Sequence, residues 1–161
     1  MKYLSLLLIF LTLFTSNIIA QVSQTEIDYI QSKYGADKKE IVANFVNLQG
    51  KEEKSFWEIY DTYEIKRKEI GVDRFKLTLH YSNNQLVFSD DDLEDEIDKF
   101  IGIKNDTDEL IENYYNKIRR KIGVQTASRF YMIERYFQNV VRVNYMKQIP
   151  FMNDLENKKN K

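Results

Sequence analysis

The chain of 161 residues contains no cysteine, a single proline, a single histidine and only five glycines. Without cysteine it has no disulfide bond, no thiol nucleophile and no site for attachment of a lipoprotein anchor. One histidine cannot form a zinc site, and a Ser-His-Asp triad would have to use His80, which no glycine elbow accompanies. A glycine-rich phosphate loop is also missing. We therefore expect a non-enzymatic protein with no catalytic residues, no bound metal and no cofactor.

The scarcity of glycine and proline also bears on the fold class. Few tight turns are available, and this composition suits long helices better than a β-sandwich or barrel. The formal net charge is only -1, so the overall charge does not indicate nucleic acid or a strongly acidic substrate as a partner. We predict an all-α protein with no nucleic-acid partner.

The N-terminal residues 1–20 have the features of a signal peptide. Lys2 supplies a positive start, residues 4–14 are almost entirely apolar, and Ala20 offers a small residue at the cleavage position. The apolar run is shorter than the ~20 residues that span a bilayer. These features predict export to the periplasm or the exterior. The alternative is a structural or membrane-anchored envelope protein that keeps an uncleaved N-terminal helix.

Apolar residues in 21–152 recur at helical spacing, which predicts four main helices in an open or hairpin-like bundle. The buried stripes of the four expected helices are Ile27, Ile30, Tyr34, Ile41, Phe45 and Leu48; Phe56, Ile59, Tyr60, Tyr63 and Ile70; Leu93, Ile97, Phe100, Ile101, Ile111, Tyr114, Ile118 and Ile122; and Phe130, Ile133, Phe137, Val140, Val141 and Asn144. Arg135, Gln138 and Arg142 are expected on the face opposite the last stripe. We predict that the Asn/Lys-rich tail, 153–161, is disordered.

The segment 75–88 fits two structures. Its first half alternates apolar and polar residues, as a half-buried strand does, and Asn83-Asn84 could turn it into a hairpin. An isolated hairpin is only marginally stable in water, and no other segment resembles a strand. We therefore favour a continuation of the second helix over the hairpin.

Ser89 gives the clearest local signal in the sequence. Its hydroxyl can cap free backbone N–H groups, and the three following aspartates, Asp90, Asp91 and Asp92, complement the positive end of a helix dipole. We predict that Ser89 caps the third helix.

Arg67 and Glu134 each occupy a position on a stripe that is otherwise apolar. Burying either charge alone is costly, whereas a paired arrangement is tolerable. We predict that the two residues form a structural ion pair between the second and fourth helices.

Charged residues are segregated along the C-terminal half. Residues 90–112 hold eleven acidic side chains, and 117–147 hold eight basic ones. Pairing of these blocks between antiparallel helices is the first interpretation. The second is that Lys117, Arg119, Arg120 and Lys121 meet an acidic client or anionic lipid headgroups at a membrane surface. Trp57 lies off its apolar stripe, where it either covers a neighbouring helix or belongs to a client-binding surface.

From about residue 49 to 152 the layout resembles the LTxxQ-type small periplasmic helical proteins of bacteria, which include Spy and CpxP. The residues that carry the resemblance are Phe56-Trp57 with Tyr60 and Tyr63, Phe88-Ser89-Asp90, Arg129-Phe130 with Glu134, and Ile149-Pro150. The chain departs from the motif at Leu48-Gln49-Gly50, which lacks the threonine. The resemblance implies a thin, curved helical protein, often a homodimer, that binds unfolded clients or a sensor protein without ATP. It thus predicts an ATP-independent periplasmic chaperone or an envelope-stress sensor partner.

Overall fold

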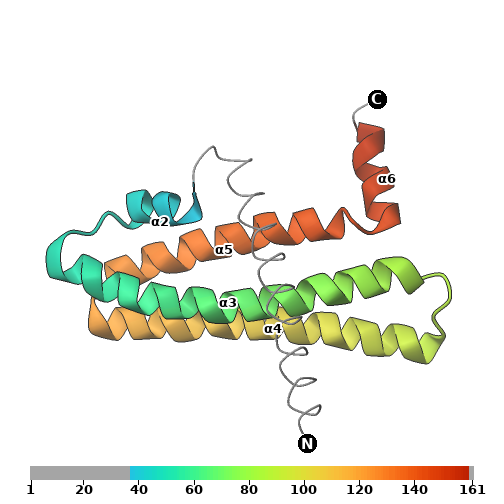
Figure 1. Ribbon diagram of the computed structural model, residues 1–161, viewed down its shortest axis with the longest axis horizontal. Helices are drawn as coiled ribbons and strands as arrows, with labels where there is room; N and C mark the ends of the chain where they lie inside the picture. Colours follow the sequence, from blue (N-terminus) through green and yellow to red (C-terminus); the bar gives the residue numbers. More distant parts are fainter. Residues whose placement is uncertain (1–36, 160–161) are drawn as a thin grey trace, which may run out of the picture.

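The computed structural model describes residues 37–159, and all the regular structure in that part of the chain is helical (Figure 1). The predicted all-α bundle is confirmed. The predicted signal peptide, 1–20, lies outside the described residues, as do Ile27, Ile30 and Tyr34 of the first expected stripe. None of the described helices is long and apolar enough to cross a membrane.

Two long helices, α3 (Gly50–Asn84) and α4 (Asp90–Lys121), form an antiparallel hairpin that runs the length of the molecule (Figure 1). The predicted cap at Ser89 is confirmed. Its hydroxyl accepts a hydrogen bond from the backbone N–H of Asp92 (3.2 Å), and the Asp92 carboxylate accepts one from the backbone N–H of Ser89 (3.0 Å). This reciprocal capping box fixes where α4 begins.

The preference for helix over hairpin is also confirmed over 75–83, because α3 remains helical through Asn84. Leu77 and Thr78 are both buried while Leu79 is exposed, so burial does not alternate as it would in a strand. The alternation of residue types therefore reflects a partly buried helix whose polar Thr78 faces inward, with its hydroxyl bonded to the Arg74 carbonyl (2.8 Å).

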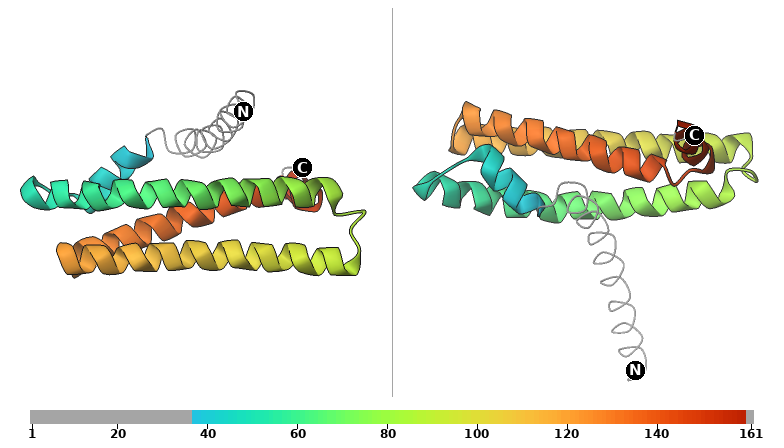
Figure 2. Two further views of the ribbon diagram at one scale, coloured as in Figure 1. Left: turned by 60° about the horizontal axis from the view of Figure 1, so that its bottom comes forward. Right: turned by 90° about the horizontal axis from the view of Figure 1, so that it is seen from above.

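Helix α5 (Val124–Met146) returns after a tight turn at Gly123, whose φ of 147° favours glycine. It packs mainly against α4 and runs obliquely to the α3–α4 pair (Figure 2). The short α2 (Lys38–Val46) lies on α5 and covers the end of the bundle where α3 begins. The core between these four helices is rich in aromatic residues and includes Phe56, Tyr60, Tyr63, Ile111, Ile118, Phe130 and Phe137.

The structure differs from the predicted disorder over 153–159, because α6 extends over Pro150–Lys159, whereas 160–161 lie outside the described residues. Proline is well suited to the first position of a helix, where its missing N–H costs nothing. Helix α6 turns away from α5 at the end of the bundle that also holds the α3–α4 loop (Figures 1 and 2). Pro150 thus begins α6 shortly after α5 has ended, and the chain continues as a helix beyond it.

Candidate functional site

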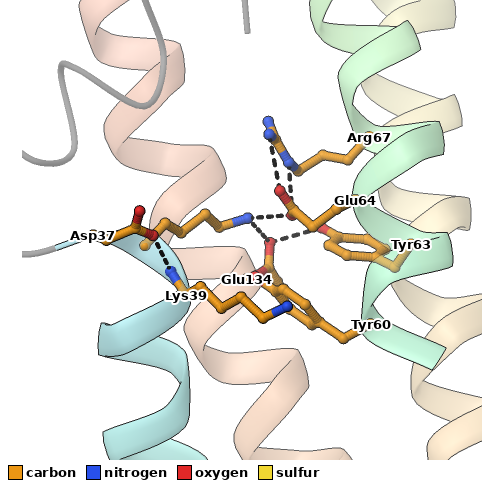
Figure 3. Close-up of polar contacts among 8 residues, drawn as sticks. Asp37, Lys39, Tyr60, Tyr63, Glu64, Arg67 and Glu134 are labelled. Carbon is orange, nitrogen blue, oxygen red and sulfur yellow. Dashed lines mark hydrogen bonds and ion pairs between the residues drawn. The ribbon is translucent and has the colours of Figure 1, made fainter. Parts of the chain in front are cut away.

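A buried cluster of charged groups, here called the Lys38 cluster, joins α2, α3 and α5 (Figure 3). It comprises Lys38, Tyr60, Tyr63, Glu64, Arg67 and Glu134. Lys38, the first residue of α2, donates to the carboxylates of Glu64 (2.6 Å) and Glu134 (3.0 Å). Because the ammonium group is almost completely buried, both carboxylates are needed to offset its lost hydration.

Glu134 is the most deeply buried member of the cluster, with an exposed fraction of 0%. Besides the contact with Lys38, it accepts hydrogen bonds from the hydroxyl groups of Tyr60 and Tyr63, both at 2.8 Å. Burial, followed by the charge of Glu134, raises the pKa of both tyrosines well above its ordinary value. The two phenols therefore stay protonated and act as donors.

The predicted direct pair between Arg67 and Glu134 is wrong. Arg67 donates to Glu64 on its own helix, through Nε at 2.8 Å and an Nη at 3.1 Å, and Glu64 shares Lys38 with Glu134. Both residues are buried as expected, but Lys38 from α2 stands between them. Burial acts to raise the pKa of Glu64, yet Lys38 and Arg67 outweigh it and hold the pKa at about 2.

Two bases and two acids make the Lys38 cluster formally neutral, and its carboxylates are satisfied by groups within it. Such a cluster can fix α2 on the bundle, because removing one member leaves another buried charge without its partner. Its contacts indicate a structural role.

Trp57 lies beside the Lys38 cluster, partly buried between α2 and α3. Its ring meets those of Phe56 (5.1 Å) and Tyr60 (5.4 Å) edge-on, and the ammonium group of Lys39 stands 4.8 Å from the ring centre. Lys39 also pairs with Asp61 on α3 at 2.9 Å. The structure therefore supports the interpretation that Trp57 covers a neighbouring helix.

The candidate basic residues Lys117, Arg119, Arg120 and Lys121 are all exposed at the C-terminal end of α4. Basic groups there complement the negative end of the helix dipole. Lys117 and Arg119 also lie over the rings of Tyr114 (5.3 Å) and Tyr115 (5.8 Å) on their own helix. These four residues are at the end of the bundle away from the α3–α4 loop (Figure 1).

In the described part of the chain, an ion pair between α4 and α5 joins the acidic block to the basic block. Arg135 on α5 donates to the carboxylate of Asp108 on α4, which also accepts from Lys104 at 3.0 Å. Burial acts to raise the pKa of Asp108, but its two basic partners bring the pKa below the usual value. This bridge ties the two helices together at mid-length.

Besides Asp108, the acidic block contains a buried carboxylate, that of Glu96 on α4. Lys99 donates to it at 2.7 Å, and Nδ1 of His80 on α3 lies 3.2 Å from its other oxygen. Burial acts to raise the pKa of Glu96, yet Lys99 and His80 lower it. The described residues contain no group of three or more acidic or histidine side chains placed to hold a metal ion.

Beyond the bridge between Asp108 and Arg135, the helices separate and leave a cavity of about 530 Å³, here called the end groove. Helices α3, α4, α5 and α6 all contribute to its walls. Its apolar lining includes Tyr81, Ile97, Phe100, Ile101, Tyr145, Met146, Ile149, Phe151 and Met152. Its polar lining includes Arg74, Thr78, Lys104, Thr107, Gln138 and Arg142.

The rim of the end groove is apolar yet open to solvent. The exposed fraction is 50% for Ile101 on α4 and 63% for Phe151 on α6. Apolar side chains gathered around a cavity of this size are typical of binding sites, because a partner that covers them removes their surface from water.

Among the residues that the structure describes, no acid lines the end groove, while three bases stand at its inner end. Arg74 donates a hydrogen bond to the hydroxyl of Thr107 at 2.9 Å, and Lys104 forms an ion pair with Asp108. Among the described residues, Arg142 takes part in no ion pair. The groove therefore has an apolar outer part and an inner part whose described charged lining groups are all basic.

Gln138 lies on the wall of the end groove with an exposed fraction of 4%, although the sequence placed it opposite the buried stripe. Its side-chain oxygen Oε1 has no hydrogen-bond donor among the described residues. An unsatisfied buried acceptor costs ~1–3 kcal/mol.

The comparisons with family models, curated proteins and solved structures find no match for this chain. The geometry of the end groove is therefore the basis for a functional assignment. Sequence reasoning placed Ile97 and Ile101 in the core and did not identify the groove. The available signal was the apolar character of 149–152 next to a proline, which extends the apolar surface past α5.

Proposed function

We propose that this chain is an exported, non-enzymatic binding protein that holds an apolar segment of a client protein in the end groove. The observation that carries the proposal is the exposed apolar rim around a cavity whose walls come from four helices. Solvent-exposed apolar surface of this kind is costly in an unbound protein and is favourable once a partner covers it.

The groove suits a flexible client better than a rigid small molecule. Its rim includes Met146 and Met152, whose unbranched side chains adapt to partners of different shape. Four helices meet there, and α5 and α6 run in other directions than the α3–α4 pair, so side chains of an unfolded chain can be covered from several sides. An unfolded protein, or an exposed segment of a sensor protein, fits this description.

Under this proposal, client binding needs no nucleotide. The grip comes from burial of apolar surface, so release follows when the client folds and withdraws its apolar side chains. This is the behaviour of an ATP-independent chaperone. Export by residues 1–20 would place the chaperone in the periplasm or outside the cell, and N-terminal sequencing of the exported protein tests that part.

An aggregation assay with paired variants tests the proposal. A chemically unfolded client is diluted into buffer with an equimolar amount of the chain, and light scattering is followed. We expect the wild-type chain to suppress scattering and Ile101→Glu to lose most of the suppression. Ile65→Glu is the matched control, because Ile65 is 60% exposed on α3 but does not line the groove. Absence of suppression by the wild-type chain, or equal loss in both variants, would contradict the proposal.

A further inference from the structure

We propose that the end groove recognises the C-terminus of a client chain, with apolar side chains in its outer part and the free carboxylate at its inner end. This inference rests on the proposed function, namely that an apolar client segment occupies the groove. Three features of the inner end support this inference: a guanidinium group, the closure of the groove and a buried amide oxygen.

The first feature is a guanidinium group without an ion-pair partner. Of the three bases that line the groove, Lys104 is neutralised by Asp108, and Arg74 donates to Thr107. Arg142, whose side chain is exposed, forms no ion pair with any residue in the described part of the chain, and none of the described lining residues is acidic. A guanidinium group binds a carboxylate through two parallel hydrogen bonds, so Arg142 is suited to a carboxylate.

The second feature is that the groove is closed at its inner end. The ion pair of Asp108 with Arg135 joins α4 to α5 directly beyond Thr107 and Gln138. Behind this bridge lies the packed core, where Ile111 is completely buried. A client segment that enters from the apolar end therefore has no path onward. A chain terminus fits such a site, whereas an internal acidic residue would require the backbone to turn back out.

The third feature is the unsatisfied Oε1 of Gln138. Gln138 and Arg142 are separated by one helical turn, so their side chains are neighbours on the same face. Oε1 is closed to solvent in the unbound chain, so the Gln138 amide has to turn toward the groove to accept a hydrogen bond. A C-terminal residue carries a backbone N–H close to its carboxylate and can then donate to Gln138 while Arg142 holds the charge. The carboxylate of a fatty acid has no such donor and would leave Oε1 unsatisfied. This difference favours a peptide over a lipid.

Fluorescence anisotropy with a short peptide tests the inference. The probe is an eight-residue peptide with fluorescein at its N-terminus and Leu-Val-Phe-Leu at its C-terminus, prepared as the free acid and as the amide. We expect amidation to weaken binding to the wild-type chain about tenfold, which is the effect of losing one charge-assisted contact. Arg142→Gln should remove the difference between acid and amide. The control Arg120→Gln, at the other end of α4, should preserve it.

Three outcomes would overturn the inference. Equal binding of acid and amide to the wild-type chain, with both lost in Ile101→Glu, would refute terminal recognition and leave the proposed function intact. Binding of neither peptide, together with no suppression of client aggregation, would refute both. The third outcome is displacement of the free-acid peptide by dodecanoate from the wild-type chain. If Gln138→Leu also binds dodecanoate and the free-acid peptide as tightly as the wild-type chain does, the groove is a lipid site.

Discussion

The ammonium group of Lys38, at the start of α2, lies 3.0 Å from the carboxylate of Glu134 in the middle of α5. Both side chains are almost entirely excluded from water, and the two residues are 96 positions apart in the sequence. A charge buried at this depth is tolerated only when its partner is present. The pair therefore fixes the position of α2 on the bundle.

Glu134→Ala should be strongly destabilising. The change removes the carboxylate that holds Lys38 and leaves the hydroxyls of Tyr60 and Tyr63 without their acceptor. We expect a loss of about 3 kcal/mol in the free energy of unfolding, measured by urea denaturation followed by circular dichroism. Glu52→Ala, at an exposed position, should cost less than about 0.5 kcal/mol. Equal losses would show that the buried cluster contributes no more than a surface residue.

Lys38→Ala should loosen α2 more than the rest of the bundle. Its removal takes away the ammonium group that connects α2 to Glu64 and Glu134. Hydrogen exchange measured by mass spectrometry should become faster over Lys38–Val46, while α4 and α5 change little. Lys39→Ala is the control, because its pair with Asp61 is solvent-exposed and contributes little. Unchanged exchange in α2 of the Lys38 variant would argue against this role.

The free energy of unfolding should fall at acid pH because of Glu64. Its pKa is held at about 2, below the ordinary 4.5, since Lys38 and Arg67 outweigh the effect of burial. A lowered folded-state pKa stabilises the fold fully above the unfolded-state pKa, and this contribution is lost as the pH falls toward the folded-state value. The urea midpoint should thus decline from about pH 5 to pH 2, and less steeply in Glu64→Gln. Glu58→Gln should follow the wild-type curve, and a Glu64→Gln curve parallel to the wild type would refute the coupling.

Ser89→Ala tests the start of α4. The substitution removes the acceptor for the Asp92 N–H and breaks the capping box. We expect a cost of about 1 kcal/mol in the free energy of unfolding. Ser128→Ala, at an exposed position inside α5, should be neutral or slightly stabilising, because alanine is the better helix former. A neutral Ser89→Ala would mean that the aspartates alone define the helix start.

Local features of the fold could be predicted from the sequence. The Ser89 cap depends on residues within one turn, and the long helices depend on apolar spacing that repeats over many turns. Burial of both Arg67 and Glu134 also followed from their positions on apolar stripes. Each of these predictions needed no knowledge of how the helices pack.

Features that depend on packing between distant segments could not be predicted. The buried face of α2 carries Lys38, Val42 and Val46, whereas apolar spacing alone favoured Phe45, which is exposed. Because a lysine is seldom expected in a core, its pairing with Glu134 was missed. The end groove was missed because its walls come from four helices, and no helix was predicted to follow Pro150.

Site-specific photocrosslinking tests most directly whether clients occupy the end groove. Benzoylphenylalanine is incorporated at position 101, on the rim of the groove, or at position 65, which is equally open on α3 but outside it. The chain is then irradiated with a chemically unfolded client. We predict strong crosslinks from position 101 and few from position 65. Equal crosslinking from both positions, or crosslinking from position 65 alone, would contradict the assignment of the groove as the client site.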